Sequence, residues 1–188
     1  MHRREALQRV AVILGGTVIG ADVFLTGCKT EEKKTSMTFS EADVPYLDEI
    51  AETIIPTTDT PGAKAAGVGK FMTVYVTDCY DEDNQKSFHE GMNKLNDAAD
   101  KKFSAEFMKL NAQQKHDLLV DLDKEQKEYQ KTRKKEDPQH YFRLMKELTL
   151  LGYFTSQIGA TKALRYVAVP TRYDGCIPYK KGDKAWAT

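Results

Sequence analysis

At residues 138–154 the chain reads Pro138-Gln-His-Tyr-Phe-Arg-Leu-Met-Lys-Glu-Leu-Thr-Leu-Leu-Gly-Tyr-Phe154. This strongly apolar segment repeats its large side chains at the three- and four-residue spacing of an α-helix. We expect the helix to begin at Pro138, because proline is tolerated in a first turn. Gly152, near the other end, would let another backbone come close. The pattern predicts the central core helix, with an apolar face made of Tyr141, Leu144, Met145, Leu148, Leu151 and Phe154.

Helical spacing also predicts the elements on either side of this segment. We expect helices at residues 41–55, 70–80, 81 to about 100 and 112–133, a short helix within 103–110, and further helical turns up to residue 165. Ser40 and Asp43 form a capping-box-like start for the first of these. Residues 70–80 also have strand propensity, but the chain offers no convincing second strand to pair with them. The prediction is an all-α fold: a single compact domain over residues 40–188, with about five to seven helices and an irregular C-terminal tail.

The first 28 residues read as a targeting segment. Arg3 and Arg4 precede an apolar run, which favours twin-arginine export, the route for folded cargo, over the general secretion route. Leu25-Thr-Gly-Cys28 resembles a bacterial lipobox, in which the cysteine thiol carries the lipid. We therefore expect a signal peptide at residues 1–27 and a lipidated flexible tether at residues 28–39. The alternative is an ordinary export signal with a chance cysteine.

Charge and cysteine content narrow the possible partners. The chain has 28 basic and 28 acidic residues, and without residues 1–27 its net charge is −1, which does not favour nucleic acid. No segment after Cys28 is apolar enough to span a bilayer, so membrane attachment would depend on the lipid. Cys79 and Cys176 then remain as an even pair in an oxidising compartment, which predicts a disulfide worth about 4–5 kcal/mol at most. The alternative is two buried free thiols.

Two irregular segments stand out from the helices. Residues 57–69 are rich in Thr, Asp and Gly, yet they match neither a phosphate-binding loop nor an oxygen-ligand cation site. We interpret them as a loop packed on the domain surface or on a partner. The tail after residue 165 is aromatic, and its Trp186 either caps the domain or anchors an interface.

Motifs for catalysis and for cofactor binding are missing from the sequence. It has no dinucleotide fingerprint, no haem attachment motif, no cysteine cluster for an iron–sulfur centre, and no visible catalytic triad or metal cluster. The residues therefore predict an exported, lipid-anchored helical domain with no catalytic residues, no metal and no cofactor of its own.

Three stretches of the mature chain resemble one known family. They are Ala51-Glu-Thr-Ile-Ile-Pro-Thr-Thr-Asp-Thr-Pro-Gly-Ala-Lys-Ala-Ala-Gly67, Leu148-Thr-Leu-Leu-Gly-Tyr-Phe-Thr-Ser156, and Tyr173-Asp-Gly-Cys176 with Gly182-Asp-Lys-Ala-Trp186. Together they are similar to the gluconate 2-dehydrogenase subunit 3 family. The resemblance implies a non-catalytic small subunit beside a glucose–methanol–choline-type flavoprotein that binds FAD, and a cytochrome c subunit that carries haem c.

Two hypotheses follow from the residues and the resemblance together. In the first, the domain is an accessory subunit that pilots the flavoprotein through twin-arginine export and tethers it to a membrane, facing the periplasm. Lys29 after the lipid cysteine, in place of an aspartate, favours the outer membrane. In the second, the chain is a stand-alone lipoprotein that binds a small ligand or a surface polymer. The interface candidates for the first hypothesis are Thr58, Asp59, Pro61, Tyr173 and Trp186.

Overall fold

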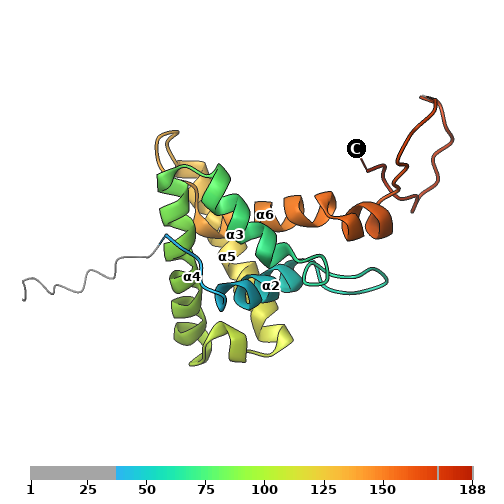
Figure 1. Ribbon diagram of the computed structural model, residues 1–188. Coiled ribbons are helices and arrows are strands. Elements are labelled where there is room, and N and C mark those ends of the chain that lie inside the picture. The colour runs from blue at the N-terminus through green and yellow to red at the C-terminus, as the bar shows by residue number, and fades with distance from the viewer. Residues whose placement is uncertain (1–36, 173, 188) are drawn as a thin grey trace, which may run out of the picture. The chain divides into compact units, whose positions relative to one another are not determined.

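The computed structural model describes residues 37–172 and 174–187, and over these residues the fold is helical (Figure 1). In chain order the helices are α2 (Asp43–Ile54), α3 (Val68–Cys79), α4 (Glu82–Phe103), the 3₁₀ turn η1 (Phe107–Lys109), α5 (Ala112–Thr132), α6 (Tyr141–Thr155) and the π-helical turn η2 (Gly159–Ala163). The described residues form no strand, and their β-type pairing is an isolated bridge between Arg165 and Trp186. The all-α prediction and the irregular tail are confirmed.

The predicted signal peptide and lipid site fall outside the described residues. The structure does not describe Arg3, Arg4, Cys28, most of the tether or Tyr173. Among the helices that the structure describes, none has the length and apolar character needed to cross a membrane.

Helix α6 is the centre of the core, as the sequence predicts. It packs against α2, α3, α4 and α5 (Figure 1). At Gly152 it is a side chain, and not the expected backbone, that comes close: a Cβ atom there would lie 2.6 Å from Cδ1 of Phe71 on α3. The buried residues of α6 are Tyr141, Phe142, Leu144, Met145, Leu148, Thr149, Gly152 and Tyr153.

Two parts of the α6 prediction are wrong. Leu151 and Phe154 are 40% and 41% exposed, because Gly152 and Tyr153 occupy the inward positions of that turn. The helix also begins at Tyr141 and not at Pro138, because the Nδ1 atom of His140 accepts a hydrogen bond from the Phe142 N–H and caps the first turn.

A capping box starts α5, and the side chain of Asp123 joins α5 to α6. Asn111 and Gln114 form a reciprocal capping box at the start of α5. Asp123 forms an ion pair with Lys127 at 2.7 Å and a second one with Lys146 of α6 at 2.6 Å. Partial burial works to raise the pKa of Asp123, but hydrogen bonds from Lys127 and Lys146 outweigh it and lower the pKa to about 2.

The predicted disulfide is absent from the structure. Cys79 and Cys176 are both free, and both are exposed, so the alternative of buried thiols is also wrong. Cys79 is the last residue of α3, whereas Cys176 lies in the tail, whose backbone hydrogen bonds run to Arg165 beyond the end of α6. The even cysteine count could not reveal this separation.

Candidate partner interface

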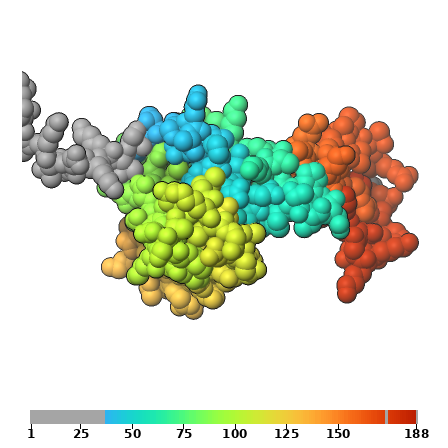
Figure 2. Space-filling model, turned by 90° about the horizontal axis from the view of Figure 1, so that it is seen from below, coloured from blue at the N-terminus to red at the C-terminus, as the bar shows by residue number. Residues whose placement is uncertain are grey.

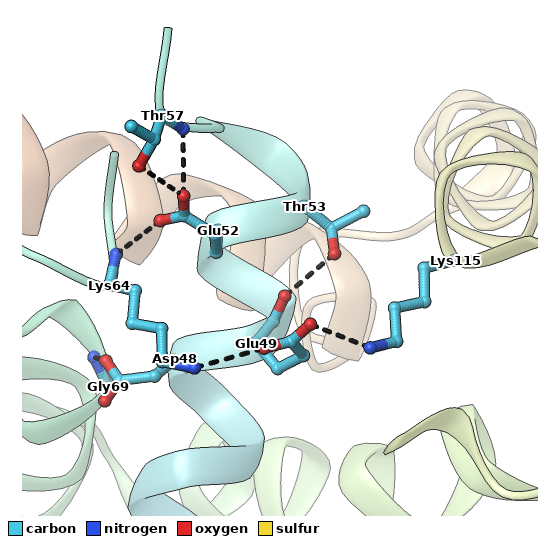
Figure 3. Close-up of polar contacts among 8 residues, drawn as sticks. All are labelled: Asp48, Glu49, Glu52, Thr53, Thr57, Lys64, Gly69 and Lys115. Atoms are coloured by element: carbon cyan, nitrogen blue, oxygen red, sulfur yellow. Dashed lines mark hydrogen bonds and ion pairs between the residues drawn. The ribbon is translucent and has the colours of Figure 1, made fainter. Parts of the chain in front are cut away.

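The connection between α2 and α3, residues 55–67, is organised around the side chain of Glu52 (Figure 3). One carboxylate oxygen accepts hydrogen bonds from the backbone N–H of Thr57 at 2.8 Å and from its hydroxyl at 2.7 Å. The other oxygen accepts the backbone N–H of Lys64 at 2.9 Å. A single side chain on α2 therefore holds both ends of the segment, which we call the Glu52 loop.

The electrostatics at Glu52 favour its charged form. Burial alone would raise the pKa of this carboxyl, but the hydrogen bonds from Thr57 and Lys64 outweigh burial, and the net pKa is lowered. Gly62 is required beside it, because a Cβ atom at this position would lie 2.3 Å from a carboxylate oxygen of Glu52. Any larger residue would displace the carboxylate from its three donors.

Two neighbouring carboxylates on α2 extend this arrangement (Figure 3). Asp48 accepts the backbone N–H of Gly69 at 2.7 Å, in the first turn of α3. Glu49 pairs with Lys115 of α5 at 2.7 Å and with Lys64 at 3.4 Å, and the hydrogen bond from Lys115 is the largest cause of its lowered pKa. The polar face of α2 thus binds the loop, α3 and α5 together.

One hydrogen bond from the core and one within the loop hold the Glu52 loop in its shape. The hydroxyl of Tyr153, on α6, donates a hydrogen bond of 2.7 Å to the carbonyl oxygen of Pro61. The N–H of Ala63 donates to the carbonyl of Ile55 at 3.0 Å. Gly67 then adopts the left-handed conformation, with φ of 68°, and starts α3. Both the core and α2 therefore hold the loop in position.

The outer side of the Glu52 loop is open to solvent, and it contains three of the predicted interface residues. Thr58 and Asp59 are exposed, and Pro61 is half-buried. The N–H of Thr58 donates to the carbonyl of Thr60 at 3.0 Å, which closes a tight turn at the tip. The structure thus gathers Thr58, Asp59 and Pro61 in one preformed loop.

Trp186 belongs to a different surface. It is 49% exposed and lies under the guanidinium of Arg165, whose centre is 4.6 Å from the ring centroid. One face of the Trp186 ring packs on the side chain of Arg165, which follows η2, and the rest of the ring is accessible to solvent. The contact with Arg165 is a local one, and the role of Trp186 as an interface anchor stays a prediction.

Sequence reasoning missed several residues of these surfaces. It gave no role to Asp48, Glu49 and Glu52, although their spacing on one side of α2 was visible. It placed Leu151 and Phe154 in the core, although with Leu150 they form an exposed apolar stripe. Over the residues that the structure describes, no group of three or more His, Cys, Asp or Glu side chains could hold a metal ion.

Comparison with known proteins gives one match. Neither the curated proteins nor the solved structures yield a significant similarity. The family model described as gluconate 2-dehydrogenase subunit 3 matches residues 41–171, well over half of the chain, and the match includes the Glu52 loop and all of α2 to α6. The chain belongs to the gluconate 2-dehydrogenase subunit 3 family.

Proposed function

We propose that this chain is the non-catalytic small subunit of a flavoprotein dehydrogenase complex of the gluconate 2-dehydrogenase type. It binds the FAD-containing subunit, assists its export and stability, and attaches it to a membrane. Its family is that of a small subunit of a dehydrogenase complex, which supports the accessory role.

The geometry of the Glu52 loop is the observation that carries this proposal. A connection of this length loses much conformational entropy when it is held in one shape. Here three hydrogen bonds to Glu52 and one from Tyr153 hold it, while Thr58 and Asp59 stay exposed. A rigid loop with an exposed tip is suited to binding a protein partner, because little further ordering is needed on association.

The export and anchoring roles are supported by the sequence at the N-terminus. Arg3 and Arg4 favour a route that carries folded cargo, and a folded small subunit can carry a bound partner with it. The lipid expected on Cys28 would then keep the complex at a membrane facing the periplasm. Haem c is expected in a separate cytochrome subunit of the complex.

Export of the partner tests the piloting role. Replacing both arginines, Arg3→Lys with Arg4→Lys, should leave this chain and the flavoprotein in the cytoplasm, as measured by fractionation and flavin content. Arg9→Lys in the same segment is the matched control and should not change export. Normal export of the flavoprotein with the double variant would rule out piloting.

Purification tests the binding role separately. The chain extracted from membranes should bring with it a subunit with flavin absorbance, and Asp59→Arg at the loop tip should reduce its yield. A chain that purifies without any flavoprotein would instead support a stand-alone lipoprotein with a small ligand or a surface polymer.

A further inference from the structure

The last two turns of α6 carry large apolar side chains on both their inner and their outer faces. Their inner face contributes Leu148, Gly152 and Tyr153 to the core. Their outer face exposes Leu150, Leu151 and Phe154 to solvent, by 41%, 40% and 41%. Exposed apolar patches on helix faces commonly mark contact surfaces, so we expect this apolar stripe to be covered in the working protein.

The first half of α6 shows that the stripe is a local feature. There the outward side chains are charged, and Arg143 pairs with Glu147 at 2.7 Å. The change from charged to apolar occurs within one helix, at the end that leads into η2 and the tail. The outer face of the first half of α6 is therefore suited to solvent, whereas the outer face of the second half needs another surface to cover it.

Beyond η2 the chain forms a long closed loop, of which the structure describes residues 166–172 and 174–185. Its ends meet at Arg165, whose N–H donates to the carbonyl of Ala185 at 2.7 Å and whose carbonyl accepts the N–H of Ala187 at 2.8 Å. With the Trp186 ring under the guanidinium, these contacts form a clasp. Loops of this length without helix or strand are uncommon and are usually functional.

The C-terminal loop exposes apolar side chains and surrounds a hollow. Val169 and Tyr179 are 74% and 78% exposed. Figure 2 shows the C-terminal residues, in red, on the visible surface of the molecule. A hollow of about 540 Å³ is lined by the apolar side chains of Ile177, Tyr179 and Trp186. Two basic and two acidic residues also line it: Arg165, Lys184, Asp174 and Asp183. Aromatic side chains around a hollow are typical of the central contacts of protein interfaces.

The charge of this region differs from that of the rest of the mature chain. Residues 162–187 contain six basic and two acidic side chains, a net charge of +4, whereas residues 28–161 carry a net charge of −5. The two acidic groups have partners within the region: Asp174 pairs with Arg172, and Asp183 accepts the N–H of Lys180. The C-terminal loop therefore offers a positive rim, which suits a negative surface.

Two other occupants fit this charge pattern less well. A second copy would bring one positive loop against another in a two-fold contact, and like charges oppose such an interface. Surface binding to a membrane commonly uses an amphipathic helix with Lys and Arg beside its apolar face. Here Glu147 adjoins the stripe, and the described residues after η2 form no helix.

We propose that the apolar stripe and the C-terminal loop form a second docking surface, for a patch on the flavoprotein subunit that is apolar at its centre and acidic at its rim. The clasp between Arg165 and Trp186 holds the loop in its binding shape. This inference rests on the proposed function and adds to it a contact region separate from the Glu52 loop, one that runs past Thr171, where the family match ends.

Charge reversal tests the rim. The full chain with Lys180→Glu and Lys181→Glu should bind the purified flavin subunit at least about tenfold more weakly at low salt, and added salt should narrow the difference. The matched control is Lys134→Glu with Lys135→Glu, in the exposed connection between α5 and α6, and it should change the affinity less than about threefold. Equal effects of the two double variants would overturn the proposal.

Substitution of the stripe and the clasp tests the apolar centre. Phe154→Ser and Trp186→Ala should each weaken binding at least about tenfold and leave the melting temperature of the helical domain nearly unchanged. Val120→Ser, at another exposed apolar site on α5, is the control. Unchanged binding by Phe154→Ser and Trp186→Ala would overturn the proposal.

A photocrosslinking residue in place of Tyr179 identifies the occupant directly. The expected adduct joins position 179 to an acidic segment of the flavin subunit. An adduct with a second copy, or binding of the Cys28→Ser chain to anionic phospholipid vesicles through Lys180 and Lys181, would overturn the proposal in favour of those occupants. If the unaltered chain brings down no flavoprotein, the proposed function itself fails, whereas a complex that ignores all these variants refutes only the second surface.

Discussion

The hydroxyl of Tyr153 and the carbonyl oxygen of Pro61 are joined by a hydrogen bond of 2.7 Å across 92 positions of the sequence. Tyr153 is 2% exposed in the core, and Pro61 lies in the Glu52 loop. The bond connects the central helix directly to the predicted interface. The position of the loop therefore depends on the packing of α6.

Tyr153→Phe should loosen this connection while keeping the aromatic ring in the core. The lost bond leaves the Pro61 carbonyl without its donor, and we expect a loss of about 1 kcal/mol in the free energy of unfolding. Urea unfolding measures it, and hydrogen exchange at Ala63 and Lys64 should become faster. Tyr166→Phe, at a 55% exposed ring, is the control, and an equal loss there would contradict the prediction.

Glu52→Gln should destabilise the loop more than a surface substitution would. The amide has one acceptor oxygen where the carboxylate has two, so either Thr57 or Lys64 loses its partner, at a cost of about 1–3 kcal/mol. Because the pKa of Glu52 is lowered on folding, its contribution is present above the unfolded pKa of about 4.3 and is lost as the pH falls through the folded pKa.

The difference between the wild-type chain and Glu52→Gln should therefore shrink in acid. Denaturant unfolding at pH 7 and at about pH 3 checks this dependence on ionisation, with Glu41→Gln as an exposed control at the start of the domain. A difference that stays constant over this range would show that the charge of Glu52 is not what holds the loop.

Gly152→Ala should push α3 and α6 apart. The added Cβ would meet the ring of Phe71 at 2.6 Å, and overpacking of this kind costs about 1–3 kcal/mol. Adding Phe71→Leu should recover part of this loss, because it removes the ring atoms in the way. Thermal unfolding of the two single variants and the double variant measures the coupling, and strictly additive effects would contradict the contact.

His140→Asn should reduce the loss of stability in mild acid. The imidazole lies between the rings of Tyr129 and Tyr141, with centroids at 5.6 and 4.5 Å. Burial lowers its pKa, Glu125 acts in the opposite direction, and Lys94 lowers it further. A lowered histidine pKa means that the unfolded chain binds more protons, so stability falls as the pH drops below about 6.5.

Asparagine keeps a good helix cap but does not titrate in this range, so the variant isolates the histidine's charge. The melting temperature at pH 8 and at pH 5.5 should differ less for His140→Asn than for the wild-type chain. Some pH dependence should remain, because burial also lowers the pKa of His89. His116→Asn, at an exposed position, is the control and should behave like the wild-type chain.

Helical periodicity predicted the elements well because each apolar face is a local property of the sequence. The segment 70–80 shows this: its Val and Tyr favour a strand, but Met72 and Val76 are four residues apart and are both buried on α3. Pro138 shows the limit, since its carbonyl accepts a hydrogen bond from Tyr129 and the cap of α6 belongs to His140. A side-chain cap competes with the proline rule, and periodicity does not distinguish the two.

The candidate interface was predicted only in outline. The composition of residues 57–69 indicated a packed loop, and the structure shows one, while the role of Thr58, Asp59 and Pro61 as partner contacts stays a prediction. The role of Glu52 was not predicted, because its partners lie up to twelve residues away and meet it only after the chain turns. The predicted pairing of Cys79 with Cys176 failed for a related reason, since even numbers of cysteines say nothing about distance.

The sequence by itself determined the all-α class, the central place of α6, the family, and an N-terminal segment with the pattern of an export signal and lipid site. Each of these rests on residues close together along the chain, whose spacing is fixed before folding. Only the tertiary structure decided which face of α6 is covered, which carboxylates hold the Glu52 loop, and that the tail closes on Arg165. Those outcomes depend on contacts between distant segments, which form only when the helices pack together.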